Sequence, residues 1–216
     1  MKPLVATKRT RVRRAPDRAL QDRSRLHEII DEAFLAHIGF ADDIPMVIPV
    51  LCWRVDENIY VHGSVGSRMI KCLANGQESC TTFTLLDGLV FARSAFYHSA
   101  NYRSAVVIGT YEVVSDKAEK TAALKSFMDQ LVKGRWQELR PMTEKELKAT
   151  AVLRLPLTEA SVKVRTGGPG DPEADQEHPV WAGVYPIEYS VKTAVSYSDQ
   201  EVAGSVPELI HPAFRI

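Results

Sequence analysis

The chain has 216 residues, of which 45% are hydrophobic and 25% are charged. This balance is typical of a globular protein and excludes collagen-like, coiled-coil and disordered chains. Lys and Arg together number 27, as do Asp and Glu, so the formal net charge is zero. A protein whose whole surface is built to bind nucleic acid or an anionic membrane is therefore not expected. A chain of this length buries about 70% of the surface that its unfolded form exposes, so one core can form without a metal or a disulfide.

The apolar runs and the cysteines point to a cytoplasmic protein. The longest apolar run, Met46–Trp53, contains Pro49 and is far shorter than the ~20 residues that a membrane-spanning helix needs. The basic residues near the N-terminus follow a very short apolar stretch, which is the reverse of a secretory signal. The cysteines are Cys52, Cys72 and Cys80, an odd number without C-x-x-C spacing. They predict reduced thiols rather than a disulfide framework or a zinc site, so we expect neither a membrane partner nor a bound metal.

Residues 1–25 form a basic N-terminal arm, with nine basic residues against two acidic ones. One interpretation is an arm that binds nucleic acid, with an affinity that would fall steeply with salt. The other is a solvated segment whose arginines pair with acidic residues elsewhere. Because no aromatic residues are interleaved with the charges, we favour the second interpretation and expect no nucleic-acid partner.

Hydrophobic periodicity predicts a few helices. Apolar residues recur with helical spacing from Leu26 to Phe34, and again over residues 116–132, where Gly134 is expected to supply the stop. A short helix fits Ser67–Ala74, and Thr143-x-x-Glu146 is a capping box that opens another. These helices are too few to cover both faces of a parallel sheet.

Most of the remaining chain reads as antiparallel strands. They are expected over residues 35–40, 46–55, 59–63, 79–86, 89–95, 102–114, 149–157 and 160–164. Asp87-Gly88 is interpreted as a tight hairpin turn between two of them. Hairpin-connected strands must close or stack to cover their edges. The sequence thus predicts a mainly β (α+β) fold, a small antiparallel barrel with peripheral helices, followed by a polar loop over residues 167–177 and an extended tail.

Glycines, serines and two cations are concentrated between Gly63 and Lys71, where a strand is expected to end and a helix to begin. Arg68 and Lys71 are three residues apart and so project from one helical face. With the hydroxyl groups of Ser64 and Ser67, they form a donor set suited to a phosphate dianion. The spacing matches neither a Walker loop nor a dinucleotide fingerprint. The alternative is a Gly/Ser loop with two solvated cations.

A second polar cluster occupies residues 89–104, between two apolar strands, where a plain connection needs only a turn. Such clusters often line a ligand pocket at the mouth of a barrel. The alternative is structural: Arg93 and Arg103 pair with carboxylates at the edge of the core, and His98 caps a loop.

Taken together, these motifs resemble the FMN-binding split-barrel superfamily, which includes the pyridoxamine 5′-phosphate oxidases. The similarity is closer to its branch of flavin-nucleotide-binding proteins related to nitroimidazole resistance proteins. The segments that carry it, in chain order, are Val47-Ile48-Pro49, Tyr60-Val61-His62-Gly63-Ser64, Ser67-Arg68-x-x-Lys71, Thr84–Val90, Asn101-Tyr102-Arg103-Ser104, Gly134-Arg135-Trp136, Glu146–Thr150, Ala160-Ser161-x-Lys163 and Pro179–Gly183. The resemblance covers residues 10–187 and implies an antiparallel split β-barrel domain over residues 26–187, with a C-terminal tail over 188–216.

The resemblance also implies FMN and its binding residues. Ser67, Arg68 and Lys71 correspond to the positions that hold the phosphate, and His62, Gly63 and Ser64 to those that line the ribityl chain. The isoalloxazine ring is expected beside Val47, Ile48 and Pro49. Tyr102, Arg103 and Ser104 approach it from a later strand, with Arg103 as a donor to the pyrimidine edge that favours the reduced flavin. Trp181 either stacks near the ring or packs structurally.

Family members are homodimers with two flavins in the subunit interface, so a homodimer is implied. The expected function is an FMN-dependent oxidoreductase that passes electrons from a reduced nicotinamide to a small organic acceptor, a nitroaromatic being one candidate. His62 or His98 could deliver a proton, although a lone histidine near a pocket is more often a structural hydrogen-bonding group. The C-terminal Arg-x-His segment that grips substrate in pyridoxamine phosphate oxidases is missing, so that reaction is not expected. The alternative function is a non-catalytic flavin- or haem-binding protein on the same barrel, because six histidines leave haem ligation open.

Overall fold

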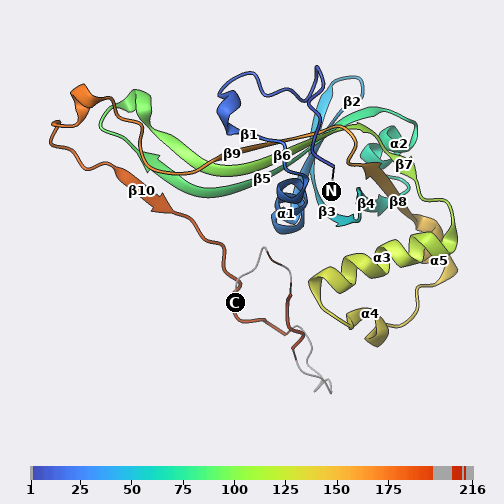
Figure 1. Ribbon diagram of the computed structural model, residues 1–216. Coiled ribbons are helices and arrows are strands. Elements are labelled where there is room, and N and C mark those ends of the chain that lie inside the picture. The colour runs from blue at the N-terminus through green and yellow to red at the C-terminus, as the bar shows by residue number, and fades with distance from the viewer. Residues whose placement is uncertain (1, 197–205, 211, 213–216) are drawn as a thin grey trace.

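Nine strands hydrogen-bond side by side in the order β1-β9-β6-β5-β2-β3-β4-β8-β7, and β10 pairs with β5 outside this path. The computed structural model describes residues 2–196, 206–210 and 212 (Figure 1). Every pairing is antiparallel. The strands are β1 (Ala19–Leu20), β2 (Leu35–Ala41), β3 (Pro45–Val55), β4 (Asn58–Ser64), β5 (Glu78–Phe91), β6 (Ser99–Thr110), β7 (Glu112–Val113), β8 (Thr150–Pro156), β9 (Ala160–Arg165) and β10 (Gly183–Pro186).

The sheet closes into a barrel because β6 and β7 are nearly continuous. Only Tyr111 separates them, while β6 pairs with β5 and β7 pairs with β8. The path from β6 through β5, β2, β3, β4 and β8 therefore returns to the chain that leaves β6. Tyr111 is buried at this junction, and its hydroxyl hydrogen-bonds that of Thr81 at 2.9 Å. The predicted mainly β, antiparallel barrel with peripheral helices is confirmed.

The helices lie outside the barrel (Figure 1). They are α1 (Arg23–Ala33), α2 (Arg68–Ala74), α3 (Lys117–Leu131), α4 (Arg135–Glu138) and α5 (Glu144–Ala149), with 3₁₀ turns η1 (Pro16–Arg18), η2 (Ala95–Tyr97) and η3 (Glu173–Asp175). The main core joins α1 and α2 to the barrel interior, and a smaller cluster lies between the sheet and α3. Successive residues of β4 point to opposite faces, so Ile59 and Val61 enter the main core while Tyr60 enters the smaller cluster.

The predicted hairpin over residues 79–95 is wrong. β5 runs without a turn from Glu78 to Phe91 and pairs along its length with β6, with a register shift between Leu86 and Gly88. Asp87-Gly88 is thus a bulge within one strand, because β6 on one side and β10 on the other supply ladder partners that local turn propensity cannot anticipate.

Three smaller expectations have mixed outcomes. The strand predicted over residues 102–114 is divided into β6 and β7. α3 ends at Leu131, and Gly134, with a φ of 80°, is the N-cap of α4 rather than the stop of α3. The capping box of Thr143 and Glu146 is confirmed at the start of α5.

The N-terminal arm packs on the barrel, since Leu4 belongs to the main core. Arg9 forms ion pairs with Glu78 and Glu159, and Arg23 pairs with Glu57. These contacts agree with the interpretation in which the arginines pair with acidic residues elsewhere. No helix within residues 2–196, 206–210 and 212 is long and apolar enough to cross a membrane.

Strands β5, β6, β9 and β10 extend well beyond the closed barrel (Figure 1). The extension ends at η2 and at the loop that leads from β9 to β10, on the left of Figure 1, whereas α2 lies on the right. The predicted site residues of α2 and those of the sheet extension therefore lie at two widely separated ends of the fold (Figure 1).

Candidate functional site

The first group of candidate side chains is the cation cluster, which we define as Ser64, Ser67, Arg68 and Lys71. Ser64 ends β4, and Ser67 is the N-cap of α2. The Ser64 Oγ accepts a hydrogen bond from the Gly66 N–H at 3.2 Å, which orders the turn between them. Met69, Ile70 and Leu73 are buried on the inner face of this helix, and Arg68 and Lys71 are exposed to solvent.

Arg68 leans from α2 toward the turn that joins β2 to β3. Its Nη2 lies 3.7 Å from the Sδ of Met46, and its Nε lies 3.7 Å from the Asp42 Oδ2. The guanidinium is 61% exposed, and this long contact is the only ion pair found for it within the described part of the chain. The cation cluster is thus next to the start of β3, where Val47 is exposed and Ile48 is half-buried. The structure brings together the two segments that were expected to hold a phosphate and a ring.

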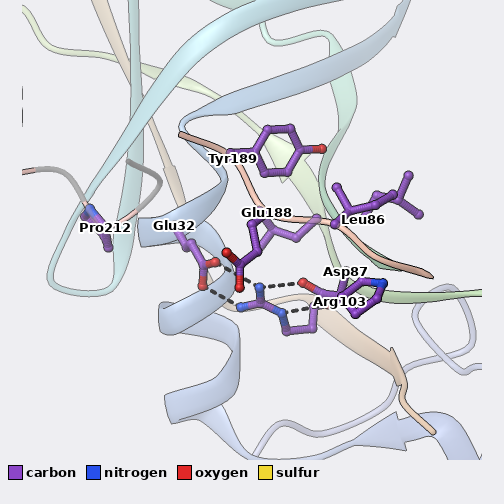
Figure 2. Close-up of a pocket in the computed structure, with 10 residues that line it drawn as sticks. Glu32, Leu86, Asp87, Arg103, Glu188, Tyr189 and Pro212 are labelled. Carbon is purple, nitrogen blue, oxygen red and sulfur yellow. Dashed lines mark hydrogen bonds and ion pairs between the residues drawn. The ribbon is translucent and has the colours of Figure 1, made fainter. Parts of the chain in front are cut away.

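The second group is the arginine pocket, a cavity of about 190 Å³ between α1, β5, β6 and the segment that follows β10 (Figure 2). Arg103 lies at its centre, between the carboxylates of Glu32 and Asp87. Its Nε and Nη2 donate to both oxygens of Asp87 at 2.9 and 2.7 Å, and Nη2 and Nη1 donate to Glu32, the former at 2.8 Å. These hydrogen bonds, first to Glu32 and then to Asp87, raise the pKa of Arg103.

The arginine pocket is chemically unlike a phosphate site. Two carboxylates against one guanidinium leave a negative charge, and ligand pockets usually exceed about 300 Å³. The neighbours of Arg103 on β6 make structural contacts as well. Tyr102 is half-buried, and the Ser104 hydroxyl donates to the Lys163 carbonyl at 3.2 Å. The geometry here matches the structural interpretation of Arg103.

His62 belongs to a third place, the aromatic cluster between β3, β4 and α3. Its ring lies 5.7 Å from that of Trp53 and 5.3 Å from that of Phe127, measured between ring centres. Its Nδ1 is buried without a hydrogen-bond partner, and burial lowers the pKa of the imidazole. His62 is therefore neutral at pH 7. It lies only two residues before Ser64 of the cation cluster, but its side chain packs in the aromatic cluster.

The fourth place is the aromatic tip, which we define as Phe91, His98, Trp181 and Tyr185. The ring centres of Phe91 lie 5.3 Å from His98, 6.2 Å from Trp181 and 5.4 Å from Tyr185. Trp181 and Tyr185 are both 58% exposed, yet they contact each other at 5.2 Å. Trp181 covers the backbone of Gly183, where an added Cβ would come within 2.7 Å of the indole. Glycine is needed there because the ring lies directly on the chain.

The cation cluster and the aromatic tip lie at opposite ends of the folded molecule (Figure 1). Within one chain, the residues of α2 predicted to bind the phosphate lie near those of β3 predicted to line the ring. Trp181 does not lie near either set. Tyr102, Arg103 and Ser104 lie on β6, where Arg103 contacts Glu32 of α1.

One partner of the predicted residues was not foreseeable from sequence. Arg93 binds Asp171, with its backbone N–H donating to Oδ1 at 2.9 Å and its Nη1 donating to Oδ2 at 2.8 Å. The Asp171 side chain is only 1% exposed, and it lies 78 positions away in a polar loop that shows no periodic pattern. The sequence predicted that Arg103 pairs with carboxylates, but it did not identify them as those of Glu32 and Asp87.

Comparison with known proteins shows to which family this architecture belongs. The family profile described as pyridoxamine 5′-phosphate oxidase matches residues 22–164. The chain belongs to the pyridoxamine 5′-phosphate oxidase-like split-barrel family. The predicted resemblance is thereby confirmed, and the barrel described above is the split barrel of that family. Among curated proteins, no significant match was found.

Two solved structures of this family are similar over nearly the whole chain. The flavocytochrome Anf3 from Azotobacter vinelandii is 42% identical, with a TM-score of 0.90, over 95% of this chain and 96% of its own. An FAD- and haem-binding protein from Mycobacterium smegmatis is 35% identical, with a TM-score of 0.83, over 88% of this chain and 94% of its own. A candidate 5-nitroimidazole antibiotic resistance protein from Bacteroides thetaiotaomicron, at 24% identity and a TM-score of 0.58 over 68% and 86% of the two chains, shares the fold.

Proposed function

We propose that this member of the family binds a flavin together with a haem and acts as a redox protein. The observation that carries the proposal is the similarity to a flavocytochrome and to an FAD- and haem-binding protein, which extends through the sheet extension and not only the barrel. This similarity favours a flavin- and haem-binding protein, the alternative raised from the sequence, over an FMN-dependent nitroreductase.

The cation cluster suits the phosphate groups of the flavin. Arg68 and Lys71 project from one face of α2, and the carboxylate of Asp42 is 3.7 Å from Arg68, which is longer than an optimal charge-assisted hydrogen bond. A guanidinium without a tightly bound carboxylate can take a phosphate at little cost. The exposed Val47 and Pro49 next to this cluster offer an apolar edge for a flat ring. The donor set therefore fits a flavin phosphate, whether from FMN or FAD.

The identity of the flavin is FAD in this proposal, in place of the FMN expected from the wider family. The support is that the Mycobacterium smegmatis protein, described as binding FAD and haem, is 35% identical over 88% of this chain. Release of the flavin by denaturation, followed by chromatography against FAD and FMN standards, tests this assignment. FAD is the expected product, and stoichiometric FMN would contradict it.

The complete site is proposed to need two copies of the chain. The cation cluster and the aromatic tip cannot face one ligand within a single chain, because they lie at opposite ends of it (Figure 1). In a homodimer, the sheet extension of one copy can reach the barrel of the other. Val47, Ile48 and Pro49 would then be covered from the partner, as the family resemblance implies for a flavin in the subunit interface.

The proposed activity is electron transfer from a reduced nicotinamide to a small organic acceptor. A bound flavin supplies the chemistry that connects a two-electron donor to one-electron acceptors, while the protein binds, orients and tunes it. Anaerobic addition of NADH or NADPH to the purified protein tests the proposal. Bleaching of the flavin absorbance, followed by a shift of the haem bands, is expected. Slow bleaching no faster than with free flavin would leave a binding protein and contradict the activity.

A further inference from the structure

We propose that His98 is the residue that would bind the haem iron, and that the aromatic tip would supply apolar contacts to the haem. This inference rests on the proposed function, in that it assumes haem binding and assigns the residue that holds the iron.

The hydrogen bond of His98 fixes the imidazole in the form that binds a metal. Its Nδ1 lies 2.9 Å from the Ser94 carbonyl oxygen. Because a carbonyl oxygen can only accept, Nδ1 carries the hydrogen and the lone pair of the neutral ring is on Nε2. Metal-bound histidines almost always donate their other ring N–H to a carbonyl or carboxylate in this manner. His98 is exposed, so Nε2 is available to an iron.

The rings around His98 offer a surface suited to a flat apolar macrocycle. Phe91 meets the imidazole edge-on at 5.3 Å and connects it to Trp181 and Tyr185. Phe96, two residues before His98, is 86% exposed. Trp181 and Tyr185 are also exposed, and groups of exposed apolar side chains mark binding sites for ligands or partners. Haem iron is commonly held by histidine, so a haem fits an imidazole beside such rings.

The backbone that carries His98 is held in place, as a ligand position requires. Arg93 binds the nearly fully buried carboxylate of Asp171 through both its backbone and its side chain. The Asn101 amide donates to the Gly167 carbonyl at 3.1 Å, at the other end of the same segment. These contacts tie residues 93–101 to the loop after β9, so the direction of the imidazole is fixed before any ligand binds.

Two other histidines are less suited to the iron. His27 lies 3.2 Å from Glu57, and its side chain is mostly buried. His62 is enclosed by Trp53 and Phe127, and a haem could reach it only if α3 moved away from the sheet.

The test is a titration of the full-length protein, loaded with flavin, with hemin. Wild type, His98→Ala and the control His178→Ala, another exposed histidine near the tip, are compared by the Soret band and by electron paramagnetic resonance of the ferric iron. His98→Ala is expected to weaken hemin binding by more than about 100-fold, since loss of even an outer-shell partner costs 10–100-fold. His178→Ala should bind as wild type does. In His98→Gly, added imidazole should restore the Soret band.

Each outcome decides one question. If wild type binds no hemin, the proposed function loses its haem, independently of His98. If wild type binds hemin and His98→Ala binds it with unchanged affinity and spin state, the assignment of His98 is wrong. The assignment is also wrong if the same loss follows from His178→Ala, His37→Ala or His62→Ala instead. A His98→Ala protein that keeps hemin but loses its oligomeric state would show that the aromatic tip is a contact between copies rather than a haem site.

Discussion

The guanidinium groups of Arg68 and Arg103 differ in their surroundings, and this difference supports the proposal of different roles for them. Arg68 is 61% exposed and has one carboxylate at 3.7 Å. The Arg103 side chain is about three-quarters buried, and its Nη2 donates to Asp87 at 2.7 Å and to Glu32 at 2.8 Å. A free donor set can take a ligand phosphate, whereas a saturated one stabilises the fold.

We expect Arg68→Ala to weaken flavin binding while the protein still folds. Hydrogen bonds to charged groups contribute about 1.5–3 kcal/mol, which corresponds to roughly a 10- to 100-fold rise in the dissociation constant. Titration with FAD, followed by flavin fluorescence, measures the change. The matched control is Arg25→Ala, an exposed arginine of α1 whose ion pair is with Glu28 in its own helix. Equal affinity in the two variants would remove the phosphate role from Arg68.

Substitution of Arg103 should affect folding more than flavin binding. Arg103→Gln leaves Glu32 and Asp87 facing each other and should lower the free energy of unfolding by about 1.5–3 kcal/mol. Arg103→Lys keeps the positive charge but not the planar, forked set of guanidinium donors, so it should lower the free energy of unfolding by less. Urea denaturation of the two variants measures the effect, together with their flavin content. A stable Arg103→Gln protein that has lost its flavin would support the ligand role instead.

His62 makes stability depend on pH. Burial lowers the pKa of its imidazole in the folded protein below the ordinary value of 6.5. The unfolded chain therefore takes up a proton first as pH falls below 6.5, and the free energy of unfolding decreases until the lowered pKa is reached. His62→Phe, which suits the aromatic cluster, should flatten this decrease below pH 6.5. An identical pH profile in wild type and variant would show that His62 is not the titrating group.

At the scale of the elements, the bulge in β5 decides how the sheet extension is built. An added Cβ at Gly88 would lie 3.0 Å from the Tyr185 carbonyl oxygen and 3.1 Å from the Val184 Cγ1. Glycine thus lets β10 approach β5 closely enough to pair. The position of Trp181 and Tyr185 at the aromatic tip follows from this pairing.

Gly88→Ala should loosen β10 from the sheet. Overpacking of this kind typically costs about 1–3 kcal/mol, and the strain is relieved by separation of the two strands. Hydrogen exchange of the amides of Gly183, Val184 and Tyr185 in β10 should accelerate relative to the barrel strands. Gly168→Ala, where an added Cβ meets nothing within 4 Å, serves as the control. If exchange in β10 is unchanged, the close approach at Gly88 does not hold the strands together.

Local patterns predicted most of the helices and barrel strands because their apolar periodicity reflects burial on one face. The buried residues of α1, for example, are Leu26, Ile29 and Ile30, which follow helical spacing. Asp87-Gly88 misled because turn propensity is local, whereas pairing with β6 and β10 depends on chain 11 or more residues away. Gly134 misled because its left-handed conformation serves the start of α4 rather than the end of α3.

At the scale of the whole molecule, sequence motifs identified the cation cluster but not its relation to the aromatic tip. Ser67, Arg68 and Lys71 are close in sequence, so their common face could be predicted. Trp181, which the sequence predicted either to stack near the ring or to pack structurally, lies two residues before β10 and contacts Phe91 and Tyr185, and β10 lies far from α2 (Figure 1). The partners of Arg93 and Arg103 come from segments 78 and 71 positions away, and no local pattern encodes such distances.

Two copies of this split-barrel protein are proposed to hold flavin and haem together. Sedimentation velocity of the purified, hemin-treated protein, monitored in the flavin and Soret bands, measures mass and cofactor content in the same experiment. We expect both absorbances to sediment together with a species of twice the 24.1 kDa chain mass, at about one flavin and one haem per chain. A colourless species at the mass of a single chain would contradict the account.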